Sequence, residues 1–165
     1  MQPSKFITQG ILKYVKGDVC NPRGGGHRIV VQINNDIGAY GAGVSGAIAK
    51  RWPKVEQEYR KWYRSQNNFK GGEIQIVDVQ TDIAVANMIA QHGIKTAGEG
   101  LPPIRYDQLR DCMNKVGEQA CETNSSIHGP RFGAGLAGGD WNQIEQLIKE
   151  LWLARGRNVT IYDLE

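Results

Sequence analysis

Long hydrophobic runs and secretory signals are missing from this sequence of 165 residues. No apolar run approaches the roughly 20 residues that a bilayer-spanning helix needs. The N-terminal segment from Met1 to Phe6 has no apolar core of the kind found in a signal peptide. We therefore expect neither insertion into a membrane nor secretion.

Cysteine and histidine are both scarce. The three cysteines, Cys20, Cys112 and Cys121, are odd in number and show no C-x-x-C spacing. This pattern argues against a disulfide framework or structural zinc and favours a reducing, cytoplasmic compartment. The histidines form no group with metal-ligand spacing. We therefore predict no metal and no cofactor.

Concentrated charge is also absent, because the net charge is only +3 and there is no basic tail. This balance allows a polyanionic small molecule as ligand but gives little support for nucleic acid. Two segments, 50–54 and 59–64, interleave basic and aromatic residues, a pattern that single-stranded nucleic acid can bind. However, the helical spacing of their aromatics favours packing in a core. We expect a monomer that binds no nucleic acid.

Hydrophobic residues make up 40% of the chain and charged residues 22%, which is ordinary globular composition. The length suits one domain, residues 1–165. Periodicity predicts strands over 11–16, 28–34, 73–79, 83–91, 125–129 and 158–162, and helices over 44–51, 53–63, 107–121 and 141–152. The three residues between the third and fourth strands predict a hairpin. The fold class is therefore α/β, a three-layer α/β/α sandwich with a mixed central sheet.

Two glycine-rich loops each follow a strand and lead into a helix. The first, from Ile37 to Gly43, leaves a β-branched central strand, and the second runs from Pro130 to Asp140. Gly133 to Gly138 forms a G-x-G-x-x-G pattern, but it comes too late in the chain for a Rossmann fingerprint. Such loops let backbone N–H groups approach an anion, and the carboxyl ends of strands are where α/β sheets bind ligands. A structural turn is the alternative for either loop alone, whereas the pair points to a binding site.

Polar residues at strand ends are the candidate ligand contacts. Asp18 either accepts a hydrogen bond from an exocyclic amine, with the backbone of Val19 beside it, or caps a turn. Asn34 and Asn35 directly follow the buried run, where amides can bind sugar hydroxyls. Asp36 is either a general base or a loop residue.

Two further residues lie near the second loop and are weak candidates for catalysis. His128 stands near a strand end and is either a catalytic group or a structural one. Asp140 is expected to cap the last long helix, with Gln143 at the position of a capping box.

Taken together, these segments resemble the macro domain, a family that binds ADP-ribose. The resemblance rests on Tyr14–Val19, on Gly41–Val44, on Pro130–Trp141 and on the closing strand Val159–Leu164. Residues 35–41 and 49–56 look most like the branch with ADP-ribose-1″-phosphate phosphatases and terminal ADP-ribose glycohydrolases.

The resemblance implies a set of ligand contacts. Asp18 and Val19 would hold adenine, and Asn35 would face the terminal ribose. The diphosphate would lie between two groups of residues: Gly41, Ala42, Gly43 and Val44, and Gly133, Ala134, Gly135, Leu136 and Ala137.

The chain departs from the family at reactive positions. Gln91 stands where the glycohydrolase has its catalytic lysine, and Ala137 is near the position of the partner acid. Ser45 replaces an aspartate of the deacetylase branch, and Gln32 replaces a histidine of the phosphatase branch. We expect hydrolysis of ADP-ribose-1″-phosphate, or of ADP-ribosyl or acetyl esters, with Asn35 orienting the ribose and Asp36, His128 or Asp140 activating water. The alternative is a non-catalytic reader of ADP-ribose or of ADP-ribosylated proteins.

Overall fold

The computed structural model describes residues 8–40, 43–94, 103–135 and 137–164. Within these ranges, six strands form a mixed sheet in the order β1-β6-β5-β2-β4-β3. The strands are β1 (Leu12–Lys16), β2 (Arg28–Asn35), β3 (Ile74–Gln80), β4 (Ile83–Gln91), β5 (Ser126–Gly129) and β6 (Val159–Asp163). The helices are α1 (Val44–Arg51), α2 (Pro53–Ser65), α3 (Tyr106–Thr123), α4 (Trp141–Leu151) and the short 3₁₀ helix η1 (Leu153–Arg155).

Among the strands of the described ranges, only the edge strand β3 runs against its neighbour, pairing antiparallel with β4 as the predicted hairpin. The pairs β1–β6, β6–β5, β5–β2 and β2–β4 are parallel. The carboxyl ends of β2, β4 and β5 therefore meet at one edge of the sheet. The two glycine loops leave β2 and β5 at this edge.

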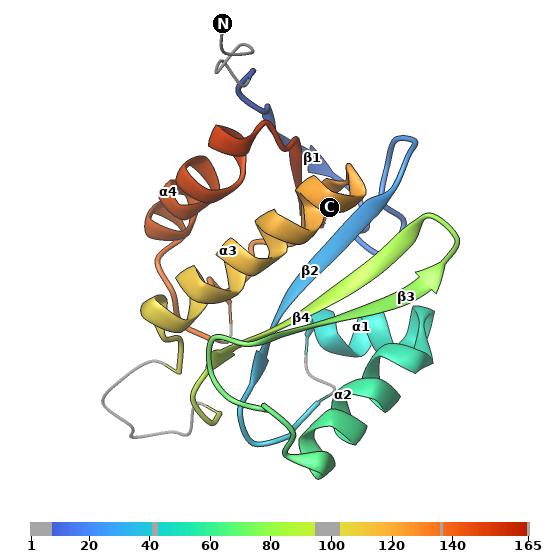
Figure 1. The fold of residues 1–165 in the computed structure, drawn as a ribbon, viewed down its shortest axis with the longest axis vertical. Coiled ribbons are helices and arrows are strands. Elements are labelled where there is room, and N and C mark those ends of the chain that lie inside the picture. The colour runs from blue at the N-terminus through green and yellow to red at the C-terminus, as the bar shows by residue number, and fades with distance from the viewer. Residues whose placement is uncertain (1–7, 41–42, 95–102, 136, 165) are drawn as a thin grey trace, which may run out of the picture.

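The helices cover both faces of the sheet (Figure 1). Helices α3 and α4 pack on one face around the fully buried Leu109, Ile144 and Ile148. Helices α1 and α2 cover the opposite face through a second cluster that includes Ile48 and Val55. β2 lies between the layers, and its Ile29, Val30 and Val31 are fully buried, as its continuous β-branched run predicts. The three-layer α/β/α architecture with a mixed sheet is confirmed.

The aromatic residues of α2 belong to the core. Tyr59 is fully buried, and Trp62 and Tyr63 pack edge-on against Phe69. Pro53 stands in the first turn, where a missing N–H costs nothing. The helical spacing of these aromatics therefore predicted correctly that the rings pack in the core.

The described residues lack both a membrane-spanning helix and a cluster of metal-binding side chains. None of the helices in those ranges is both long and apolar enough to cross a membrane. The same ranges contain no group of three or more His, Cys, Asp or Glu side chains that could hold a metal ion. Cys20 and Cys112 are buried free thiols, and Cys121 is an exposed one.

Candidate functional site

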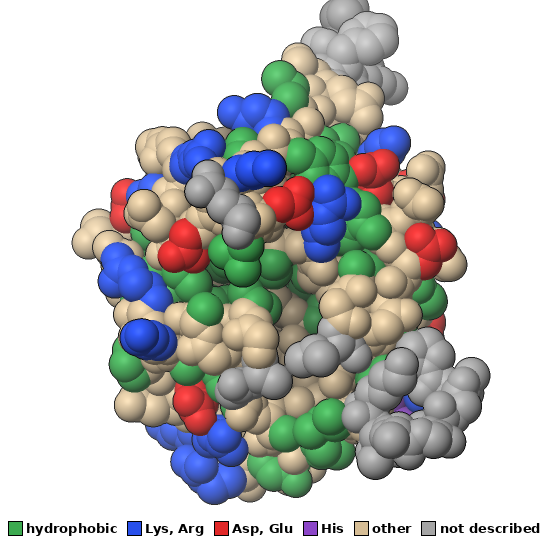
Figure 2. Space-filling view, turned by 180° about the vertical axis from the view of Figure 1, so that it is seen from behind, with side chains coloured by type: hydrophobic (Ala, Val, Ile, Leu, Met, Phe, Trp, Pro, Cys, Tyr) green, Lys and Arg blue, Asp and Glu red, His purple; other side chains and the backbone are tan. Residues whose placement is uncertain are grey.

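A cavity of about 640 Å³ opens where the carboxyl ends of β2, β4 and β5 meet. This volume is within the usual range of small-molecule sites, roughly 300–1,000 Å³. The described residues that line it are 33–35, 39–40 and 43–45 from β2 to α1, 91 and 94 after β4, and 130–132, 135 and 137 after β5. Figure 2 shows a hollow near the middle of the face opposite to that of Figure 1, with hydrophobic and uncharged side chains around it.

The first glycine loop places the start of α1 at the cavity. Gly43 is the N-cap of α1, with φ 57° and ψ −129°, a backbone conformation that residues with a Cβ rarely adopt. Gly43 and Val44 both line the cavity, so the first N–H groups of α1 lie at its wall. This end of a helix favours an anion. Gly41 and Ala42, predicted to bind the same group, lie outside the described residues.

The second glycine loop is shaped by close packing. Gly133 has φ 81°, and a Cβ there would stand 2.8–2.9 Å from the side-chain ends of Ile33, Ile104 and Ile144. Its carbonyl accepts the N–H of Gly139 at 2.6 Å, which closes the loop on itself. Gly133 therefore fixes the path of the loop and does not line the cavity.

The ligand positions predicted in the second loop divide into three sets. Gly135 and Ala137 line the cavity. Ala134 donates its N–H to the carbonyl of Arg131 at 3.2 Å and is absent from the described lining. Leu136 lies outside the described residues.

Asn34 carries an unused hydrogen-bond acceptor at the cavity. The residue is only 3% exposed, and it lines the cavity at the end of β2. Its Oδ1 is buried and has no hydrogen-bond partner among the described residues. A buried acceptor without a partner costs about 1–3 kcal/mol. Such a cost is typical of a site whose partner arrives with the ligand.

Asn35 uses most of its amide to build the first loop. Its Oδ1 accepts the N–H groups of Ile37 and Ala39, each at 3.0 Å, and the hydroxyl of Tyr59 lies 3.1 Å away. Its Nδ2 donates to the carbonyl of Ala39 at 2.7 Å. Asn35 lines the cavity, but four contacts within the chain leave it far less capacity for a sugar than Asn34 has. Its predicted role in orienting the ribose stays a prediction.

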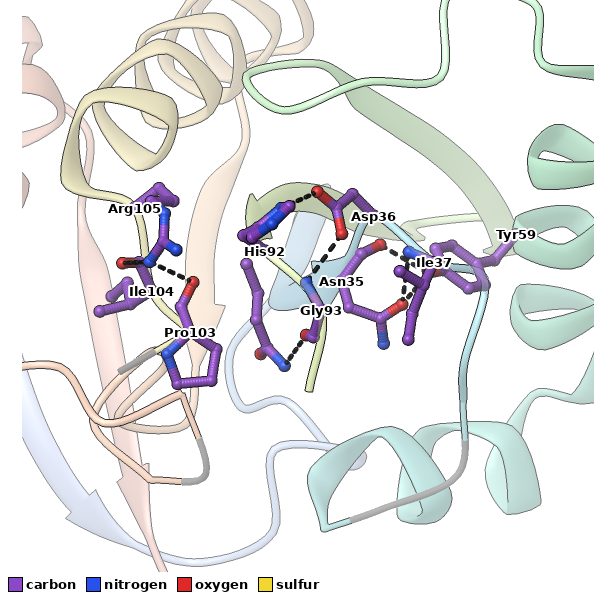
Figure 3. A network of polar contacts seen from close by, with 10 residues as sticks. Asn35, Asp36, Ile37, Tyr59, His92, Gly93, Pro103, Ile104 and Arg105 are labelled. Carbon is purple, nitrogen blue, oxygen red and sulfur yellow. Dashed lines mark hydrogen bonds and ion pairs between the residues drawn. The ribbon is translucent and has the colours of Figure 1, made fainter. Parts of the chain in front are cut away.

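Asp36 joins the ends of β2 and β4 (Figure 3). Its Oδ1 accepts the N–H of Gly93 at 2.8 Å, and its Oδ2 lies 2.8 Å from Nδ1 of the exposed His92. Asp36 is not among the described lining residues. Both carboxylate oxygens have partners, so Asp36 stabilises the loop that follows β4. The structure adds no support for Asp36 as a general base.

Asp140 caps α4, as predicted. Its Oδ1 accepts the N–H of Asn142 at 2.9 Å. Its own N–H donates to the hydroxyl of Tyr106 at 2.7 Å, so Tyr106 occupies the place expected for the Gln143 side chain of a capping box. Asp140 is exposed and is not among the described residues that line the cavity.

The side chain of His128 lies on the α1–α2 face of the sheet, away from the described lining of the cavity. The side chain alternates with that of Ile127, and it packs beside Tyr162 on the face of α1 and α2. Its Nδ1 is 2.8 Å from the Tyr162 hydroxyl, and its Nε2 is 2.8 Å from Ser126 Oγ. Both ring nitrogens therefore have partners, and His128 is absent from the described lining. A catalytic role for His128 stays a prediction.

The burial of His128 predicts a pH dependence of stability. Burial, aided by the positive charges of Arg28 and Lys13, lowers the pKa of His128 from 6.5 to about 4. Between these values the unfolded chain binds a proton that the folded chain does not, so protonation favours unfolding. We expect the free energy of unfolding to fall by up to about 3 kcal/mol as the pH drops from 7 to 4. Urea unfolding at a series of pH values measures this loss, and His128→Gln is expected to remove it. An equal loss in this variant would contradict the assignment.

Asp18 and Val19 lie outside the described lining of the cavity. Asp18 is exposed after β1, where its Oδ1 accepts the N–H of Cys20 at 2.9 Å and its carbonyl accepts that of Asn21. It therefore caps a turn, which was the structural alternative for this residue. Val19 is buried in the α1–α2 cluster. Adenine binding by either residue stays a prediction.

Sequence reasoning missed several residues of the cavity wall. Arg131 is the ionised side chain of the described lining, held by Asp163 through contacts of 2.8 and 3.1 Å. Its guanidinium stacks 4.9 Å from the centre of the Tyr14 ring and 5.5 Å from that of Trp141. The motif Pro130–Trp141 contained the arginine, but its orientation depends on strands far away in the sequence. Tyr40 also lines the cavity and was not among the predicted site residues, and Ser45 was noted only for the aspartate that it replaces.

Comparison with known proteins places this geometry in a family. Residues 31–148 match the family model of the Macro domain. The chain belongs to the macro domain family. An ADP-ribose 1''-phosphate phosphatase of Candida albicans is 24% identical to this macro domain over 146 residues, which covers 85% of this chain and 93% of the yeast protein.

Solved structures agree with this assignment. A Bacteroides thetaiotaomicron protein of unknown function is 45% identical, with a TM-score of 0.91 over 93% of this chain and 98% of the other. A macrodomain protein from Streptomyces coelicolor is 39% identical, with a TM-score of 0.83 over 92% of this chain and 98% of the other.

Proposed function

We propose that this macro domain binds ADP-ribose in the cavity between its two glycine loops. The observation that carries the proposal is that Asn34, a residue of the cavity lining, has a buried Oδ1 without a partner among the described residues. A ribose hydroxyl is a donor that would satisfy it. The start of α1 at Gly43 and Val44 offers N–H groups to a diphosphate on the same wall.

We further propose hydrolysis of ADP-ribose-1″-phosphate as the favoured activity, with ADP-ribosyl or acetyl esters as other substrates. The support is the Candida albicans phosphatase, which matches this chain along nearly its full length. In this proposal the cavity contributes position and hydrogen-bond donors around the phosphate, because Asp36 and His128 already have partners for their polar atoms.

The second candidate is a reader that binds ADP-ribose, free or attached to a protein, without turnover. One observation favours it: the described residues that line the cavity include no aspartate, glutamate, histidine or lysine. General acid–base catalysis uses such groups, and it typically contributes a factor of roughly 100 to 10,000 to a rate.

Two measurements on one preparation separate these functions. Calorimetry with ADP-ribose is expected to show binding, and phosphate release from ADP-ribose-1″-phosphate is expected to exceed the uncatalysed rate. Binding without product from this substrate or from acetylated ADP-ribose would identify a reader. No binding of ADP-ribose would overturn both candidates. Asn142→Ala, which lies on α4 outside the described lining, serves as a folded control for the binding assay.

A further inference from the structure

A row of three carboxamides crosses the sheet beneath α1 and α2. Gln32 of β2 lies opposite Asn87 of β4, which lies opposite Gln75 of β3. Gln32 Nε2 donates to Asn87 Oδ1 at 2.8 Å, and Asn87 Nδ2 donates to Gln75 Oε1 at 3.0 Å. Gln32 and Asn87 are fully buried, among neighbours such as Val30 and Val85 that are apolar. Burying amides is costly unless every polar atom is paired, so this row calls for a functional reason.

The contact at the Gln75 end determines which atom of each amide donates and which accepts along the row. Gln75 Nε2 donates to the backbone carbonyl of Glu58 in α2 at 3.0 Å. Because a peptide carbonyl only accepts, Gln75 must turn its nitrogen toward α2 and its oxygen toward Asn87. The same logic makes Asn87 present its oxygen to Gln32. The Glu58 carbonyl therefore fixes the orientation of each amide along the row from β3 through β4 to β2.

The other end of the row reaches the cavity wall. Ser45 Oγ donates to Gln32 Oε1 at 2.9 Å, and Gln32 Nε2 donates to the Tyr40 hydroxyl at 3.0 Å. Both Ser45 and Tyr40 line the cavity. The proton of Ser45 is thus committed to Gln32, which leaves its oxygen lone pairs as acceptors. Tyr40 accepts from Gln32 and keeps its own proton to donate.

Ser45 and Asn34 together offer two acceptors on one wall. Gln32 and Asn34 are two positions apart in β2, so their side chains leave the same face of the strand. The hydrogen bond to Gln32 holds Ser45 on the face of β2 that also carries Asn34, and both residues line the cavity. Two acceptors on one wall suit a ribose, whose hydroxyls on adjacent carbons both donate. A phosphate has no hydrogen to give at neutral pH and does not suit them.

We propose that the Gln32–Asn87–Gln75 row positions Ser45 to accept a hydrogen bond from a hydroxyl of the terminal ribose, and Tyr40 to donate one to the same ligand. This inference rests on the proposed binding of ADP-ribose and adds the residues that recognise its terminal sugar. Burial raises the pKa of Tyr40 to about 12, which keeps the phenol protonated as a donor at neutral pH. Gln32 acts through the two hydroxyls and is a positioning residue.

The test compares ADP-ribose with ADP, which has the diphosphate and adenosine but lacks the terminal ribose. Calorimetry is expected to show that Ser45→Ala weakens ADP-ribose binding by roughly fivefold, as for one lost neutral hydrogen bond, while ADP binding changes less than about twofold. Ser65→Ala, at the exposed end of α2, is the matched control and should bind both ligands like the original protein.

Gln32→Met supplies the test of positioning. Alone, it is expected to weaken ADP-ribose binding by at least as much as Ser45→Ala. In a chain that already carries Ser45→Ala and Tyr40→Phe, the same substitution should change ADP-ribose affinity by less than about twofold. A loss of several-fold in that background would show that Gln32 acts otherwise and would overturn the proposal.

The outcomes distinguish failure of the proposed ADP-ribose binding from failure of the proposed roles of Ser45 and Tyr40. If the original protein binds no ADP-ribose, the proposed function fails. If it binds ADP-ribose and Ser45→Ala and Tyr40→Phe bind it equally well, the inference fails and the proposed function stands. Should Gln32→Met not fold, as thermal unfolding would show, this comparison of the two hydroxyl variants still decides.

Discussion

The substitution Gly133→Ala is expected to lower the free energy of unfolding by about 2–4 kcal/mol. A Cβ at this residue would stand 2.8–2.9 Å from the side-chain ends of Ile33 in β2, Ile104 just before α3 and Ile144 in α4. Relief of this crowding costs about 1–3 kcal/mol, and a φ of 81° adds roughly 1 kcal/mol for a residue with a side chain. We also expect ADP-ribose affinity to fall, because the loop that carries Gly135 and Ala137 must shift.

Gly135→Ala is the matched control, since it adds the same methyl group in the same loop. A Cβ there would meet nothing within 4 Å, and the residue lines the cavity. The free energy of unfolding should change by less than about 1 kcal/mol, whereas ADP-ribose binding should weaken because the methyl group enters the cavity. Urea unfolding and calorimetry measure the two effects. Equal stability of both variants would contradict the packing described for Gly133.

Asn34→Val is expected to stabilise the protein and to abolish most of its binding. The substitution removes the buried Oδ1 that has no partner and places a β-branched residue in a strand. We expect the free energy of unfolding to rise by about 1–2 kcal/mol. The affinity for ADP-ribose should fall by about tenfold or more, because the hydroxyl that pairs with Asn34 loses its acceptor.

Asn87→Val provides the comparison, because it removes another buried amide on the same face of the sheet. Asn87 has partners at both ends, Gln32 and Gln75, which the substitution leaves unpaired. This variant should lose about 2 kcal/mol or more of stability. If Asn34→Val is as destabilised as Asn87→Val, then Asn34 has a structural partner and the argument for its role in binding is wrong.

The elements of the fold could be predicted because their patterns are local. The β-branched run of β2, the short connection of the β3–β4 hairpin and the cap at Asp140 are all short-range signals, and the structure has each of them, with two residues rather than three between β3 and β4. The aromatic spacing of α2 also predicted correctly that its rings pack in the core. The order of the strands in the sheet could not be predicted, because β1 pairs with β6, a strand far away in the sequence.

The site was predicted less completely than the fold, because the sequence does not show which polar atoms already have hydrogen-bond partners. The meeting of the two glycine loops follows from their places at strand ends, and Asn34, Gly43, Val44, Gly135 and Ala137 do line one cavity. Residue type alone does not tell which polar atoms are already satisfied. Asn34 and Asn35 look equivalent in the sequence, yet Asn35 is used to build its loop while Asn34 keeps an unused oxygen. Likewise, the partners of Asp36 and His128 come from other strands and loops.

The central claim is that the cavity between the two glycine loops holds ADP-ribose. A crystal structure of the complex tests it most directly. We expect the diphosphate between residues 43–44 and residues 135 and 137, with a hydroxyl of the terminal ribose about 3 Å from Asn34 Oδ1. ADP-ribose bound elsewhere on the protein, or bound in the cavity with no contact to Asn34, would contradict it.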